Sequence, residues 1–120
     1  MSKKKLENER SPSVQISKDN QVVTLVNVFA LNITADQDEL IRLLEEATEK
    51  VMRHLDGFVS ASIHRSLDGS KVVNYAQWRS REAFEAMLQN TEARRHMAKA
   101  YELSKPEPSL YKVASVHTLT

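Results

Sequence analysis

The 120-residue sequence has no cysteine, only two glycines and no long apolar segment. The absence of cysteine excludes disulfides, thiolate catalysis and cysteine-ligated zinc or iron–sulfur sites. No apolar run approaches the roughly 20 residues that a membrane-spanning helix needs, so we expect no membrane partner. The formal net charge of +1 gives no electrostatic basis for binding nucleic acid.

The length suits one domain, and we assign residues 21–120 to it. Residues 1–20 are polar and cannot bury enough apolar surface to offset the cost of ordering, so we expect a flexible tail. Three lysines at positions 3–5 are not followed by an apolar segment, which argues against a secretory signal. A cytoplasmic location is the resulting expectation.

The first half has the pattern of a strand followed by a helix. Val22–Leu31 is apolar on both faces, as in a strand buried on both sides. Asp36–Leu55 carries apolar residues at spacings of three and four, which predicts an amphipathic helix. Thr34 and Gln37 are placed to form a capping box, and Gly57 is expected to stop the helix.

The second half predicts a hairpin, two helical segments and a last strand. The hairpin strands are Phe58–Arg65 and Val72–Trp78. Ser80 is expected to cap a short helix, and a second helix is expected to start at Asn90 or Thr91. Pro106 and Pro108 are expected to break that helix, and Leu110–Leu119 alternates like a strand.

The resulting order, β–α–β–β–α–β, predicts an α+β, ferredoxin-like fold with a four-stranded antiparallel sheet. Helices would cover only one face of that sheet. Because the strands are apolar on both faces, we expect the second face to pack on a second copy, as a homodimer.

The hairpin turn decides which polar side chains share a face. A two-residue turn at Asp68 and Gly69 pairs position 64 with 73, and His64 then lies on the opposite face of the sheet from Asn74. A type I turn with Gly69 as a bulge pairs 64 with 72, and His64, Asn74 and Trp78 then share a face. The apolar pattern favours the bulged turn, because register follows such patterning.

His64, Asn74 and Trp78 are the candidate site. An imidazole, a carboxamide and an indole N–H can together hold a polar aromatic molecule. An unpaired buried polar group costs roughly 1–3 kcal/mol, so these groups need one another, water or a ligand. A strand histidine and a core tryptophan with purely structural roles remain the alternative.

The segment HRSLDGSKVVNYAQW, followed by SREAFEAM, resembles the antibiotic biosynthesis monooxygenase family. Asp56-Gly57-Phe58 also fits, and the resemblance covers about residues 21–119. VVNYAQW is its most specific part. The resemblance implies a dimeric α+β barrel and a cofactor-independent monooxygenase that oxidises an aromatic phenol, anthrone or hydroquinone to a quinone with O2.

The resemblance also implies roles for individual residues. His64, Asn74 and Trp78 match the family's site positions. The family's tyrosine after the tryptophan is replaced by Phe84, and its arginine has only Arg94 or Arg95 nearby. The substrate-binding residues that we expect beside the catalytic ones are Asn27, Phe84, Met87 and Met97.

Three other functions fit parts of the sequence. A haem-degrading branch of the same superfamily would use Asn27, but Met87 stands in place of its tryptophan and His96 is about one residue from its iron ligand. A non-catalytic module that binds a small aromatic molecule would look the same in sequence. A metal enzyme is disfavoured, because the four histidines lack ligand spacing: His54, His64, His96 and His117.

Overall fold

The computed structural model describes residues 11–120. Half of the tail predicted over residues 1–20 therefore lies outside the described residues. The other half, residues 11–20, contains no helix or strand. It is nevertheless attached at one point, because the Gln15 carbonyl accepts a 2.8 Å hydrogen bond from Gln77 Nε2 on the sheet.

The elements follow the predicted order, with two 3-10 turns added. They are β1 (Val23–Leu31), η1 (Thr34–Asp36), α2 (Gln37–Lys50), η2 (Met52–His54), β2 (Phe58–Arg65), β3 (Lys71–Trp78), α3 (Arg81–Leu88), α4 (Thr91–Leu103) and β4 (Ser104–Tyr111). The four strands form one antiparallel sheet in the order β2-β3-β1-β4. The ferredoxin-like α+β prediction is confirmed.

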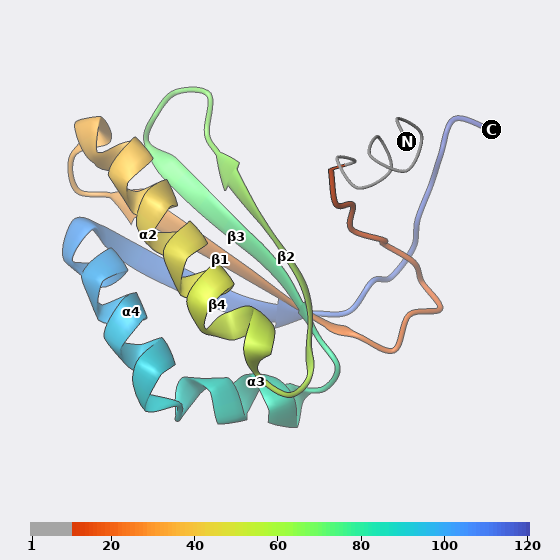
Figure 1. Cartoon of the computed structure of the whole chain (residues 1–120). Helices are drawn as coiled ribbons and strands as arrows, with labels where there is room; N and C mark the ends of the chain where they lie inside the picture. Colours follow the sequence, from red (N-terminus) through yellow and green to blue (C-terminus); the bar gives the residue numbers. More distant parts are fainter. Residues whose placement is uncertain (1–10) are drawn as a thin grey trace, which may run out of the picture.

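The helices lie on one face of the sheet (Figure 1). The core forms where α2 and α4 pack against the central strands, and Phe29, Leu40 and Val72 have no exposed surface there. Two alanines on α4, Ala93 and Ala100, are buried and allow this helix to approach closely. No helix within residues 11–120 is long and apolar enough to cross a membrane.

The predicted helix Asp36–Leu55 is shorter and starts differently. It ends at Lys50, and the chain continues through η2 instead. The expected capping box does not form, because Gln37 Nε2 donates to the carbonyls of Ser66 (3.1 Å) and Lys71 (3.0 Å). The glutamine side chain thus joins the start of α2 to the β2–β3 loop.

The prediction for the last strand is wrong. The strand is Ser104–Tyr111, it contains both prolines, and the residues after Tyr111 form no regular structure. β4 is an edge strand that pairs only with β1, with Pro106 opposite Phe29 and Pro108 opposite Asn27. Because the two prolines are two residues apart, their backbone nitrogens face the same side of the strand. That side is the free edge of the sheet, where the N–H group that proline lacks is not needed.

Gly57 allows the start of β2 to pass close to α3. Its φ is +87°, and a Cβ built there would overlap the Cβ of Ala83. Gly69 has a similar φ of +80° but open space around it. Both positions therefore require the positive φ that favours glycine, but only Gly57 also lacks room for a side chain.

We expect Gly57→Ala to lower the free energy of unfolding by about 1–3 kcal/mol more than Gly69→Ala, because only Gly57→Ala adds a steric overlap. Urea unfolding followed by tryptophan fluorescence measures both values. Equal losses in the two variants would show that the approach of α3 to Gly57 is not a close one.

Candidate active site

The hairpin register separates His64 from the other two candidate residues. His64 pairs with Val73, and Ile63 pairs with Asn74. The prediction that positions 64 and 72 pair is therefore wrong. Because neighbouring strand positions point to opposite faces, Asn74 faces the helices and His64 faces away from them.

The loop explains the error. Leu67 and Asp68 do form a turn closed by Gly69 N donating to Ser66 O (3.2 Å), with Gly69 left-handed. The loop nevertheless includes Ser70, because the Asp68 carboxylate accepts hydrogen bonds from Ser70 N (3.0 Å) and Ser70 Oγ (2.7 Å). These bonds and one from Ser66 Oγ lower the pKa of Asp68 to about 2. One extra loop residue shifts the register by one.

A second irregularity restores the pattern at the other end of the hairpin. Phe58 pairs with Trp78 but Ser60 pairs with Gln77, so Val59 is an extra residue in β2. Phe58 therefore lies on the same face as Trp78, and Ala61 lies on that face beside Ala76. On the opposite face, His64 Nε2 lies 2.9 Å from Ser62 Oγ and is exposed.

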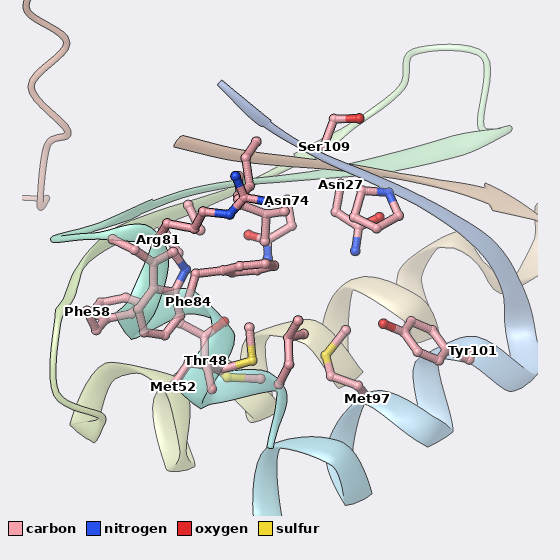
Figure 2. A pocket seen from close by; sticks show the side chains of 18 residues that line it. Asn27, Thr48, Met52, Phe58, Asn74, Arg81, Phe84, Met97, Tyr101 and Ser109 are labelled. Carbon is pink, nitrogen blue, oxygen red and sulfur yellow. The ribbon is translucent and has the colours of Figure 1, made fainter. Parts of the chain in front are cut away.

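A cavity of about 540 Å³ lies between the sheet and the helices (Figure 2). Its volume is in the range of small-molecule sites. The residues that line it are Leu25, Asn27, Thr48, Met52, Phe58, Ala61, Asn74, Ala76, Trp78, Arg81, Phe84, Met87, Leu88, Met97, Tyr101, Pro108, Ser109 and Leu110. Six of the seven residues expected in the site are among them, and His64 is not.

Three buried polar atoms in the cavity wall have no hydrogen-bond partner within residues 11–120. They are Asn27 Oδ1, Asn74 Oδ1 and Trp78 Nε1. Asn27 and Asn74 are paired across β1 and β3, so their carboxamides lie side by side on the cavity face. A buried polar atom without a hydrogen bond costs free energy, and a ligand in the cavity can form the hydrogen bonds that these atoms lack. A fourth such atom, Thr24 Oγ1, belongs to the opposite face.

Aromatic rings and methionines form the rest of the wall. Trp78 is 2% exposed and meets Phe58 edge-on, with ring centroids 5.6 Å apart at 89°. Phe84 lies 6.5 Å from Trp78 at 68°. Ser80 Oγ caps α3 by accepting from Ala83 N (3.1 Å), which fixes the helix that carries Phe84. These contacts hold the indole in a defined orientation.

The sequence did not identify Arg81 and Tyr101 as cavity residues. Arg81 is the only charged side chain among the described residues of the wall, and its Nε donates to Glu85 Oε2 (3.2 Å). It starts α3, three residues after Trp78, and that short spacing was the available signal. Of the two arginines expected nearby, Arg94 lines an adjoining hollow and Arg95 pairs with Glu92 (3.1 Å).

Tyr101 lies at the opposite side of the cavity from Arg81 (Figure 2). Partial burial raises the pKa of its phenol. Thr48 also lines the cavity, but its hydroxyl is already donated to the Leu44 carbonyl (2.9 Å).

The residues required by the haem and metal hypotheses do not come together. His96 is absent from the cavity wall, and its Nδ1 lies 3.7 Å from Glu46 Oε1. Among the described residues, no group of three or more histidine, aspartate or glutamate side chains is arranged to hold a metal ion.

Comparisons with known proteins identify a family and similar monooxygenases. The family profile for antibiotic biosynthesis monooxygenases matches residues 23–99. Tetracenomycin-F1 monooxygenase of Streptomyces glaucescens is 44% identical over 93 residues, which are 78% of this chain and 82% of that protein.

Two solved structures have the same fold. The monooxygenase from the gene ActVA-Orf6 of Streptomyces coelicolor, in complex with nanaomycin D, has a TM-score of 0.75 and 26% identity, covering 85% of this chain and 96% of that one. SnoaB, a cofactor-independent oxygenase from Streptomyces nogalater, has a TM-score of 0.62 and 26% identity, covering 82% and 96%.

Trp78 is the only tryptophan of the chain and provides a direct probe of the cavity. We expect 2-hydroxy-1,4-naphthoquinone to quench its fluorescence saturably, because a bound ring contacts the indole. Ala61→Phe, which adds a ring to the cavity, should weaken that binding by about tenfold or more. Quenching no greater than that of free tryptophan, or unchanged in Ala61→Phe, would show that the ligand binds elsewhere or not at all.

Proposed function

The chain belongs to the antibiotic biosynthesis monooxygenase family, and from this premise we propose that it oxidises a polyketide-like phenol, anthrone or hydroquinone to a quinone with O2. The reaction would use neither a metal nor a flavin. The observation that carries the proposal is the set of three unpartnered polar atoms in an aromatic cavity. Two of its relatives are monooxygenases, and another is a cofactor-independent oxygenase.

The residues that line the cavity support such a substrate by their chemistry. Aromatic and methionine side chains accept the faces of fused rings. Trp78 Nε1–H is a donor only, so it suits a carbonyl or phenolate oxygen, whereas the Asn27 and Asn74 oxygens accept from a phenol hydroxyl. A polycycle that carries both kinds of oxygen satisfies all three atoms at once.

Without a cofactor, the substrate must supply the electrons that reduce O2. Loss of a proton converts an anthrone or phenol to an electron-rich anion, which can transfer an electron to O2. Preorganised donors stabilise such an anion by about 2.7–4 kcal/mol each, and the Trp78 N–H and the Asn74 amide are the donors on the cavity face. The substrate radical and the superoxide then combine to a peroxide anion, which takes up a proton and loses water to leave the quinone carbonyl.

The proposal includes a homodimer formed through the sheet face that the helices leave open. Val26, Val28, Val73 and Tyr75 lie on that face and are only partly buried. An apolar patch in the middle of a sheet is a typical contact between identical subunits. The dimer would bury these residues and would leave the cavity on the helix side of each subunit.

We expect the protein to consume O2 with 1,8-dihydroxyanthrone above the rate of autoxidation. Asn74→Ala and Trp78→Phe should each lower turnover by about tenfold or more, because each removes a hydrogen-bond donor from the cavity. His64→Ala is the matched control in the same hairpin and should keep the original rate.

An oxygen electrode and the visible absorbance of the quinone measure these rates. Original turnover in both Asn74→Ala and Trp78→Phe would refute the site. Saturable quinone binding with no O2 uptake from any anthrone or hydroquinone would instead favour the non-catalytic binding module.

We expect Val73→Asp to convert the dimer to a monomer, because it places a charge in the middle of the open sheet face. Ile33→Asp, which alters an exposed apolar residue of the β1–α2 connection, should leave the dimer intact. Analytical ultracentrifugation distinguishes the two states. A monomeric unaltered protein, or a dimeric Val73→Asp variant, would contradict the proposed interface.

A further inference from the structure

The cavity contains almost no group that can exchange a proton. None of the four histidines lines it, and neither does any acidic side chain that the structure describes. Its two ionisable side chains are Arg81 and Tyr101. A guanidinium remains charged in proteins and does not release its proton. Among the described residues of this wall, Tyr101 is therefore the one side chain that can act as an acid and release a proton.

Packing within the subunit fixes where Tyr101 lies. It is near the end of α4, one turn after Met97, which also lines the cavity. Its ring lies 6.4 Å from the fully buried ring of Phe29, at an angle of 33°. The hydroxyl points from this contact into the cavity (Figure 2), and it makes no hydrogen bond to any described residue.

The other two tyrosines do not reach the cavity. Tyr75 is paired with Val26 on the open face of the sheet, and Tyr111 is paired with Thr24 at the end of β4. Tyr111 is 52% exposed, and Tyr101 is 44% exposed. Tyr111 therefore serves as a matched control with similar exposure and the same chemistry outside the cavity.

We propose that Tyr101 is a catalytic residue, whose hydroxyl donates a proton to the oxygen that leaves the substrate peroxide. This step rests on the proposed oxygenation. The departing oxygen becomes hydroxide unless it is protonated, and a phenol is a much stronger acid than water. The phenol carries its proton near neutral pH, because the ordinary pKa of tyrosine is about 10 and partial burial raises the pKa of Tyr101.

The step balances in atoms and electrons. The substrate CH2 first loses one proton to solvent, and its carbon forms a bond to O2, which takes up the two electrons of the carbanion. A proton from solvent converts the peroxide anion to a hydroperoxide. The remaining C–H bond then breaks, its electron pair forms the C=O bond, and the O–O bond breaks. The departing hydroxide takes the Tyr101 proton and becomes water, and the proton from the C–H bond restores the phenol.

Tyr101→Phe removes only the hydroxyl and keeps the ring that packs on Phe29. We expect kcat with 1,8-dihydroxyanthrone to fall by about 100-fold, the scale of general acid catalysis. The dissociation constant for 2-hydroxy-1,4-naphthoquinone, measured by Trp78 quenching, should stay within about twofold, because ring contacts hold the ligand. Tyr111→Phe should match the unaltered protein in both measurements.

Each outcome discriminates. A kcat in Tyr101→Phe that falls by less than about tenfold would overturn the assignment, as would a loss of quinone affinity as large as the loss of kcat. In either case, oxidation by the unaltered protein would leave the proposed function standing. The absence of O2 uptake in the unaltered protein would defeat the proposed function first, and this step with it.

Discussion

The register of the β2–β3 hairpin is the constraint on which the site depends. It pairs Ile63 with Asn74 and turns Asn74 toward the helices, where β1 places Asn27 beside it. A register shifted by one residue would move every side chain of β2 to the other face. Two local features set this register: a four-residue loop closed on Asp68, and the extra residue Val59 that keeps Phe58 beside Trp78.

Much of the fold could be predicted from periodicity and composition. The β–α–β–β–α–β order, the hairpin strands and the caps at Ser80 and Asn90 follow from local patterns, and the structure has them. The last strand was misplaced because prolines usually end regular structure, whereas an edge strand tolerates them. That tolerance depends on where the strand lies in the sheet, which a local pattern does not contain.

The site was predictable in part, for a similar reason. Asn74 and Trp78 lie four residues apart on one strand, so the alternation of side chains places them on the same face whatever the type of the hairpin turn. The position of His64 depended on one loop residue, Ser70, which the apolar pattern could not assign. Tyr101 could not be assigned to the cavity from the sequence, because one helical period suits both a core contact and a cavity wall.

The composition of the cavity also restricts the substrate. The described residues of the wall include no carboxylate or imidazole that could remove a proton from a weakly acidic carbon, so the proposed reaction needs a substrate that ionises readily by itself. Phenols and anthrones meet that condition, and simple hydrocarbons do not. In the proposed reaction, turnover thus depends on the acidity of the substrate and on donors that stabilise its anion, and Tyr101 is the proposed donor of the late proton.

The most direct test of this account is a crystal structure of the protein with 2-hydroxy-1,4-naphthoquinone. The account predicts the ring in the cavity beside Trp78, with its oxygens within hydrogen-bond distance of the Asn27 and Asn74 amides and of the Trp78 N–H. Ligand bound on the open face of the sheet near His64, or a cavity in which these three groups turn away from the ligand, would contradict it.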